Sequence, residues 1–204
     1  MVVVDSATPP KRAMCPRCER PETVCLCDAM VQVNSPVEVI IWQDPTEARH
    51  KLSTAPLLHK SLPGSRLLVA DELTPEQVFG SDNLVGCALL YPLDQGEVVT
   101  AEHKAEVQTL LILDGTWRKV RRLIHLNPWL NQLPYVALNP EYQSQYRIRK
   151  SPREDGLSTI EAGVAALSWL DQQQDYLPVL NVLEKMVSLQ EQLTPERRSN
   201  RREN

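Results

Sequence analysis

Residues 109–126 read TLLILDGTWRKVRRLIHL, and this stretch decides the class of fold. Its first five residues form a short, mainly aliphatic run, which is typical of a buried β-strand. Asp114 and Gly115 interrupt the run. From Thr116 onward the apolar residues recur at helical spacing, as Trp117, Val120, Leu123 and Ile124. The stretch therefore predicts a strand over 109–113 that passes through a tight turn into a helix over 116–126.

The same alternation extends over most of the chain. Short apolar runs predict further strands at 37–42, 66–70, 87–91 and 135–138. The segments between and after them predict helices at 46–58, 101–108, 158–172 and 177–193, and a capped helix start at Thr74-Pro75-Glu76-Gln77. Because strands that alternate with helices pair mainly in parallel, we expect an α/β protein with a mostly parallel sheet.

Length and composition exclude several classes of protein. The chain has 204 residues, of which 42% are hydrophobic and 24% charged, so it suits one domain with a core and not a disordered chain. No stretch approaches the roughly 18 apolar residues of a transmembrane helix. Residues 1–12 lack the pattern of a signal peptide. We therefore expect a cytoplasmic protein without a membrane partner, and no feature predicts a protein partner.

The distribution of charge is more informative than its sum. The formal net charge is −4, which does not suit a protein that is basic over its whole surface. Residues 118–153, however, contain eight Lys or Arg residues and a single acid, Glu141. An acidic protein with one basic segment can still present a local face to an anion such as a nucleic acid.

Four of the five cysteines lie together, as Cys15, Cys18, Cys25 and Cys27. Without a secretory signal, clustered cysteines are more often metal ligands than disulfides. Four thiolates within thirteen residues suit tetrahedral zinc, and the segment holds too few apolar residues to fold without a metal. We predict a structural zinc site, with an iron–sulfur cluster or free thiols as the alternatives. The fifth cysteine, Cys87, lies in an apolar run and is expected to be a small buried side chain.

The turn after residue 113 is a candidate ligand site. In open parallel sheets ligands bind beyond the carboxyl ends of the strands, and Asp114 lies at such an end. Gly115 lets the backbone turn or a ligand approach, and Thr116 can cap the next helix. An ordinary capped helix explains the same residues, so both interpretations stay open. The polar face of that helix carries cations that repel one another unless they are solvated or face an anion: Arg118, Lys119, Arg121 and Arg122.

A second candidate site lies in residues 146–162, which read YRIRKSPREDGLSTIEA. Ser158 and Glu161 have the spacing of a capping box, which by itself predicts only a well-started helix. A helix start after a glycine-bearing loop also offers free N–H groups to a carboxylate or a phosphate. The spacing does not decide between these two interpretations.

Taken together, these motifs resemble the DTW-domain family. Residues 114–117 resemble its Asp-x-Thr-Trp signature, and three other motifs follow the family's order and approximate spacing. They are the cysteine cluster, Leu90-Tyr91-Pro92, and the segment that contains Tyr146-Arg147-x-Arg149-Lys150 and Leu157-Ser158-Thr159-x-Glu161-Ala162. The resemblance extends over about residues 14 to 180.

The resemblance implies a fold and a reaction. The fold would be similar to the knotted, SPOUT-like proteins that bind S-adenosylmethionine. The reaction would be transfer of the 3-amino-3-carboxypropyl group of that donor to N3 of a uridine in the variable loop of tRNA, with release of methylthioadenosine. Three alternatives stay open: an RNA methyltransferase with the same donor, a zinc-bearing RNA-binding protein without catalysis, and an α/β protein whose capped helices have no chemical role.

The resemblance also implies roles for individual residues. The catalytic residues would be Asp114, Thr116 and Trp117. Asp114 would accept a proton, hold the donor's amine or only hold the turn at the end of the strand, and Trp117 would pack in the core or stack. The donor would contact Tyr91, Pro92, Leu113, Asp114, Thr116, Ser158, Thr159 and Glu161. The phosphates of tRNA would contact Arg118, Lys119, Arg121, Arg122, Arg147, Arg149 and Lys150. We accordingly expect a flexible tail over 1–13, a zinc module over 14–30, a catalytic domain over 31–194 and a basic tail over 195–204.

Overall fold

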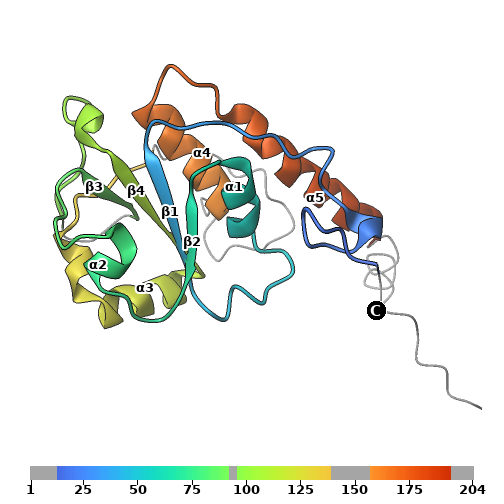
Figure 1. Ribbon diagram of the computed structural model, residues 1–204, viewed down its shortest axis with the longest axis horizontal. Coiled ribbons are helices and arrows are strands. Elements are labelled where there is room, and N and C mark those ends of the chain that lie inside the picture. The colour runs from blue at the N-terminus through green and yellow to red at the C-terminus, as the bar shows by residue number, and fades with distance from the viewer. Residues whose placement is uncertain (1–12, 92–95, 139–156, 194–204) are drawn as a thin grey trace, which may run out of the picture.

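The computed structural model describes residues 13–91, 96–138 and 157–193. Their centre is a four-stranded, entirely parallel sheet in the order β2-β1-β4-β3 (Figure 1). The strands are β1 (Glu38–Gln43), β2 (Arg66–Val69), β3 (Cys87–Leu90) and β4 (Thr109–Asp114). Four of the five predicted strands are therefore confirmed, each to within a residue at either end.

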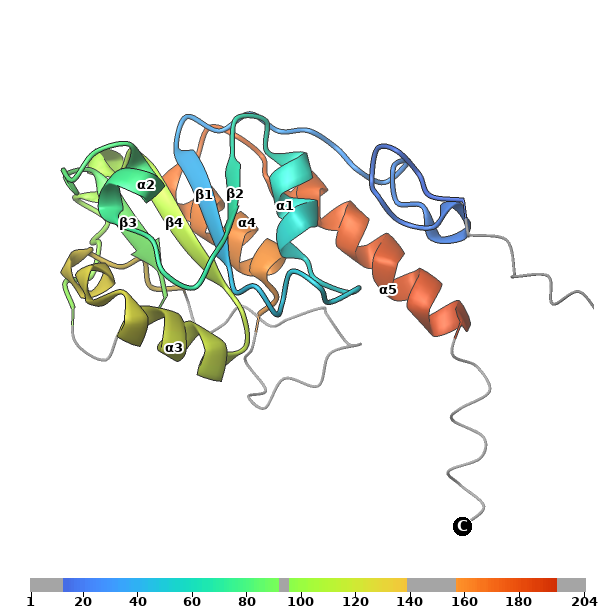
Figure 2. The same ribbon diagram turned by 60° about the horizontal axis from the view of Figure 1, so that its bottom comes forward.

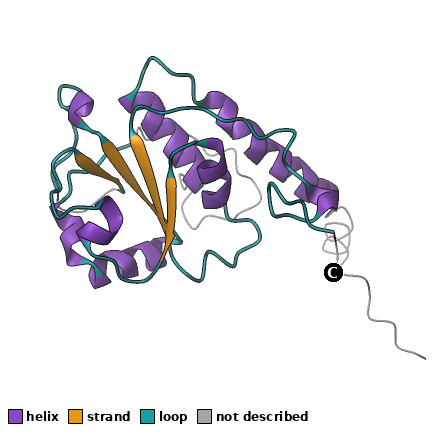
Figure 3. Cartoon of the chain, in the orientation of Figure 1, coloured by secondary structure: helices purple, strands orange, loops and turns teal. Residues whose placement is uncertain are grey.

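Helices cover both faces of the sheet, so the described part of the chain forms three layers (Figure 3). One face packs on α1 (Ala55–Ser61), α4 (Thr159–Leu170) and α5 (Asn181–Leu193). The other face packs on α2 (Pro75–Phe79) and α3 (Trp117–Leu126). Neighbouring residues of β4 belong to opposite cores, since Ile112 faces the α1/α4 side and Leu111 the α3 side. Burial of both faces explains why the strands are almost continuously apolar in sequence.

The two central strands lead to opposite faces of the sheet. After β1 the chain continues into α1 and reaches the edge strand β2, whereas after β4 it continues into α3 on the other face (Figure 2). Adjacent parallel strands whose connections diverge in this way define a topological switch point, where a crevice forms beyond their carboxyl ends. The ends that meet at this point are Gln43 of β1 and Asp114 of β4, which are paired in register.

Local sequence signals account for two helix starts. Thr74 and Gln77 form the predicted capping box of α2, and Gly80 ends that helix in a left-handed conformation with φ of 74°. The predicted capping box of Ser158 and Glu161 begins α4. Both predictions are confirmed because a capping box depends only on residues three positions apart.

Three predicted helices are wrong in extent. Only the last part of 46–58 is helical, because turns occupy 45–49 and Pro56 lies in the first turn of α1 and does not disrupt it. The segment 101–108 contains just a 3₁₀ turn at Lys104–Glu106. The segment 177–193 divides into a 3₁₀ turn at Leu177–Leu180, which contains Pro178, and then α5.

The predicted strand at 135–138 is also wrong. Tyr135 makes only isolated bridges, one to Leu89 of β3 and one to Val98. Its pairing with β3 consists of two backbone hydrogen bonds to Leu89, one accepted by the carbonyl of Pro134 and one donated by the N–H of Val136, and it does not continue into a regular ladder. Among the described residues, no helix is both long and apolar enough to cross a membrane.

Candidate functional site

Asp114 is a buried acid at the end of a central strand. Its side chain is 4% exposed, and its position two residues after Ile112 directs it to the α1/α4 face of the sheet. The amide of Gln43 donates to Oδ2 at 2.7 Å, and the hydroxyl of Thr159 donates to Oδ1. Burial of a carboxylate is costly unless it is hydrogen-bonded, and these two donors satisfy one oxygen each. The result is a rigidly held acid at the switch point.

Thr159 brings a distant motif to this acid. It is the first residue of α4, directly after Ser158, whose N–H and hydroxyl both donate to Oε2 of Glu161 at 2.8 and 2.6 Å. Ser158 and Glu161 are both 7% exposed. The two sequence motifs around 114–117 and around 158–161 therefore meet in one buried polar site.

Two other predicted donor contacts, Leu113 and Tyr91, lie on the opposite side of the sheet. Leu113 belongs to the α3-side core, and Tyr91, directly after β3, packs against the same core. The ring centroid of Tyr91 lies 5.5 Å from that of Trp117, which is half-buried. Thr116 occupies the N-cap position of α3, but its exposed side chain makes no capping hydrogen bond. Pro92 lies outside the described residues.

Gln43 is not among the predicted site residues, yet it is 1% exposed and contacts Asp114 directly. Ser53 is not among them either, and its hydroxyl accepts the second hydrogen bond of the Gln43 amide at 2.8 Å. The available signal was the abrupt change from the apolar run of β1 to a polar pair, Gln43 and Asp44. This change mirrors the one that ends β4 at Asp114.

Asp44 begins the loop that joins β1 to α1. It is 1% exposed, and its Oδ1 accepts hydrogen bonds from the backbone N–H and the hydroxyl of Thr46. Burial alone raises the pKa of Asp44, but these hydrogen bonds and the charge of Lys119 outweigh it and leave the pKa below its ordinary value. The loop therefore carries a stable negative charge that faces the cations of α3.

Two of the four predicted RNA-binding cations on α3 form ion pairs with acids of the same chain. Lys119 lies 3.0 Å from Oε1 of the buried Glu47. The Nη1 atom of Arg122 lies 2.6 Å from Oδ1 of Asp71 and 3.6 Å from Oδ2 of Asp44. Arg118 and Arg121 are exposed and have no ion-pair partner within the part of the chain that the structure describes. The remaining predicted RNA contacts, Arg147, Arg149 and Lys150, lie outside the described residues.

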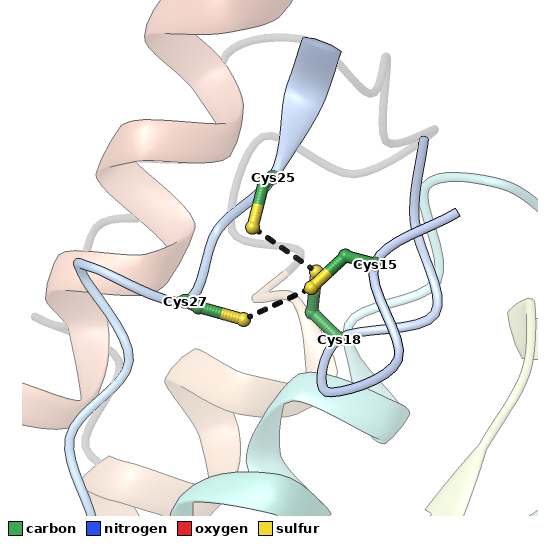
Figure 4. Close-up of side chains that lie close together, drawn as sticks. All are labelled: Cys15, Cys18, Cys25 and Cys27. Carbon is green, nitrogen blue, oxygen red and sulfur yellow. Dashed lines mark hydrogen bonds between the residues drawn. The ribbon is translucent and has the colours of Figure 1, made fainter. Parts of the chain in front are cut away.

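The four clustered cysteines converge on one point (Figure 4). Their sulfur atoms all lie within 4.8 Å of one another, with Cys15 and Cys27 at 3.5 Å and Cys18 and Cys25 at 3.7 Å. A disulfide requires about 2.05 Å between sulfurs, whereas a tetrahedron of metal–sulfur bonds of about 2.3 Å places them roughly 3.8 Å apart. The donor set and its spacing therefore fit a tetrahedral metal ion.

The surroundings of the cluster affect its thiols differently. Backbone N–H groups of Cys18 and Arg17 and the Cys27 thiol lower the pKa of Cys15 to about 6. Burial and the neighbouring sulfurs raise the pKa of Cys27 to about 12. Because a metal binds thiolates, its binding must displace the protons that these thiols retain.

The cysteine cluster docks on the rest of the protein beside α5 (Figure 2). Arg20 donates to Met186 of α5 and to the backbone carbonyl of Lys51, both at 3.0 Å, and Leu26 is completely buried in the α1/α4-side core. The cluster is thus attached to the helix layer that also supplies Thr159.

A separate cavity of about 430 Å³ opens beside the capping box of α4. It lies along α5, and its lining includes Glu161, Leu183, Glu184 and Glu191. Its volume is in the range of small-molecule sites. Among the described residues that line the cavity, Glu161 also belongs to the polar site around Asp114.

The fold and the site define a class of protein. It is a three-layer α/β protein with a buried acid at the switch point of a parallel sheet and with four cysteines placed to bind a metal ion. The family model of the DTW domain matches residues 12–191. Since this match extends over most of the chain, the chain belongs to the DTW domain family.

The chain is also similar in sequence to several curated proteins. The chain is 32% identical to tRNA-uridine aminocarboxypropyltransferase 2 of Drosophila melanogaster, over 81% of this chain and 70% of that protein. It is 31% identical to the protein of the same name from Macaca fascicularis, over 79% of this chain but only 57% of that longer protein. It is 26% identical to tRNA-uridine aminocarboxypropyltransferase A of Arabidopsis thaliana, over 88% of this chain and 81% of that protein. No solved structure matches the chain significantly.

Proposed function

We propose that this chain is a tRNA-uridine aminocarboxypropyltransferase. It takes the 3-amino-3-carboxypropyl group from S-adenosylmethionine, attaches it to N3 of a uridine in the variable loop of tRNA, and releases methylthioadenosine. The observation that carries the proposal is that the family's Asp-x-Thr-Trp signature places Asp114 at the switch point of the sheet, hydrogen-bonded to the start of α4. The names of the relatives support the same activity.

The donor supplies a sulfonium leaving group next to an electrophilic γ-carbon, so the chain's own task is positioning and proton transfer. In the transfer the bond between N3 and the γ-carbon forms, the bond between that carbon and sulfur breaks, and N3 loses its proton. A carboxylate such as Asp114 can accept that proton directly or through water. The same carboxylate can instead pair with the donor's amine, which fixes the γ-carbon toward the nucleophile.

The residues near Asp114 suit the donor chemically. A buried carboxylate matches a primary amine, and the N-terminal N–H groups of α4 match a carboxylate. We assign Ser158, Thr159 and Glu161 to this part of the donor. The remaining donor contacts, Tyr91, Pro92, Leu113 and Thr116, remain predictions from the family resemblance, as do the catalytic roles of Thr116 and Trp117. A knotted, SPOUT-like path of the chain is part of the same proposal, and the all-parallel sheet is consistent with it.

The tRNA would meet the exposed cations of α3. Arg118 and Arg121 are available for phosphate contacts, whereas Lys119 and Arg122 already form ion pairs with Glu47 and Asp71. We propose that Arg118 and Arg121, together with the basic residues Arg147, Arg149 and Lys150, hold the nucleic acid. The target base must be unpaired or flipped out for N3 to be reached.

We propose that the metal held by Cys15, Cys18, Cys25 and Cys27 is zinc in a structural role. Four thiolates close the coordination shell, so no position is open for a substrate. The contacts of Arg20 with α5 and with Lys51 support a role in holding the layer around α5 in place.

The decisive experiment is incubation of the purified chain with tRNA and S-adenosylmethionine, followed by mass spectrometry of the nucleosides. We expect a uridine enlarged by one aminocarboxypropyl group and an equal amount of methylthioadenosine. A uridine enlarged only by a methyl group would instead identify a methyltransferase. Binding of tRNA without any product would identify an RNA-binding protein, and either result would refute the proposal.

A further inference from the structure

Gln43 is a buried amide in direct contact with the acid of the signature. It ends β1 opposite Asp114 in the parallel register, and it lies two residues after Ile41, on the same α1/α4 face as Asp114. Its Nε2 donates to Oδ2 of Asp114 at 2.7 Å and to the hydroxyl of Ser53 at 2.8 Å. Burial of a polar side chain costs free energy of folding unless the side chain is hydrogen-bonded. The two hydrogen bonds of Gln43 offset this cost and direct its amide toward Asp114.

The hydrogen-bonding groups of the Gln43 amide suit one protonation state of Asp114 better than the other. An amide nitrogen has two hydrogens and accepts none, and both hydrogens are used here. The reverse orientation of the amide would place Oε1 against a carboxylate oxygen, two acceptors in contact. The orientation that the structure shows therefore matches an ionised Asp114, and a proton on Oδ2 would require the amide to turn over.

Together with Thr159, the amide also fixes the plane of the carboxylate. Gln43 reaches Oδ2 from β1, and Thr159 reaches Oδ1 from α4. Ser53 anchors the amide on the loop between β1 and α1. With two donors from different elements, the carboxylate cannot rotate without breaking at least one hydrogen bond.

We infer that Gln43 is a positioning residue that orients Asp114 and keeps it ionised for transfer, with Ser53 as its support. The inference deepens the proposed function and rests on it for the consequence in catalysis. The hydrogen-bond geometry itself does not depend on the reaction.

The test compares Gln43→Met, which keeps the approximate length but not the donor, with Gln43→Glu, which places a second acid beside Asp114. For Gln43→Met we expect kcat to fall by on the order of 10²-fold, as for a misplaced reacting group. For Gln43→Glu we expect the rise of activity with pH to move upward by a pH unit or more, because two adjacent carboxylates do not readily both ionise. Ser53→Ala should move both quantities in the same direction by less.

Gln77→Met is the matched control, because it removes the same amide from the capping box of α2. It should lower the thermal midpoint of unfolding without changing the pH profile. A folded Gln43→Met protein with wild-type kcat and pH profile would overturn the inference.

A second measurement separates this inference from the proposed function. The carboxyl carbon of Asp114 can be followed by NMR as a function of pH in the wild type, Gln43→Met, Gln43→Glu and Ser53→Ala, without any substrate. An upward shift of its titration midpoint in the Gln43 variants supports the inference even if the wild type modifies no tRNA. The lack of tRNA modification would refute only the proposed function. An unchanged midpoint in all variants that fold overturns it.

Discussion

The hydroxyl of Thr159 donates a hydrogen bond to Oδ1 of Asp114, although the two residues are 45 positions apart in the chain. The bond joins the first turn of α4 to the carboxyl end of β4. The position of the acid of the signature is therefore linked directly to the position of α4.

Replacement of Thr159 by valine tests this link. Thr159→Val keeps the shape of the side chain but removes one donor from a buried carboxylate, so we expect the free energy of unfolding to fall by about 1–3 kcal/mol. Transfer activity should fall as well. Denaturant unfolding and release of methylthioadenosine measure the two effects. Thr159→Ser, which keeps the hydroxyl, should stay close to the wild type, and equal stability of both variants would contradict the link.

Replacement of Asp114 distinguishes its two proposed roles. Asp114→Asn is nearly isosteric but carries no charge, and we expect turnover to be abolished in it, as in Asp114→Ala. Calorimetry of S-adenosylmethionine binding then assigns the role. Donor affinity near the wild-type value indicates proton acceptance, whereas a large loss of affinity indicates a contact with the amine. Full turnover in a folded Asp114→Ala protein would eliminate both roles.

The exposed cations of α3 should act on RNA affinity alone. We expect Arg118→Ala and Arg121→Ala each to weaken tRNA binding and to reduce the slope of log affinity against log salt concentration by about 1. The thermal midpoint should not change, because neither residue has an ion-pair partner among the described residues. Arg122→Ala is the comparison. Loss of its ion pairs with Asp71 and Asp44 should lower the thermal midpoint of unfolding. Binding curves at several salt concentrations measure the difference, and unchanged slopes for Arg118 and Arg121 would refute their role.

The close packing of α4 on α1 predicts a sensitive glycine. A Cβ atom added to Gly163 would lie 2.5 Å from Cδ2 of the fully buried Leu58 and 3.3 Å from Cδ1 of Ile112. Although alanine favours a helix by about 1 kcal/mol over glycine, overpacking typically costs about 1–3 kcal/mol. We therefore expect Gly163→Ala to lower the free energy of unfolding.

A double-mutant cycle provides the control for this clash. The second change, Leu58→Ala, opens space for the new methyl group, so the combined loss should be smaller than the sum of the two single losses. Denaturant unfolding of the four proteins gives the coupling. Strict additivity would show that the two residues do not compete for the same space.

Removal of the metal should loosen the cysteine module without unfolding the sheet. We expect about one zinc ion per chain by elemental analysis, lost in Cys25→Ser and Cys27→Ser because a tetrahedral site needs all four thiolates. Hydrogen exchange should then accelerate in residues 15–27 and much less in β1 and β4. Cys87→Ala is the control, since Cys87 lies in the α3-side core and should leave the metal content unchanged. Full metal retention in the serine variants would contradict the site.

The local features of this protein follow from its sequence alone. The four strands were predictable because each apolar run is short and bounded by polar or turn residues, and the capping boxes of α2 and α4 were predictable because their residues are three positions apart. The cysteine cluster was predictable for the same reason of proximity in the chain. Where local signals were weak or contradictory, as at 46–58 and 135–138, the predicted element did not form as expected.

Only the tertiary structure decided how these pieces meet. The strand order β2-β1-β4-β3 makes Gln43 and Asp114 neighbours, and nothing in the spacing of residues 43 and 114 encodes that adjacency. Sequence spacing likewise does not encode the hydrogen bond between Thr159 and Asp114 or the ion pair between Glu47 and Lys119. Hydrophobic burial drives strands and helices together without specifying polar partners. The polar partners are therefore set by the register and packing of whole elements, and these become visible only in three dimensions.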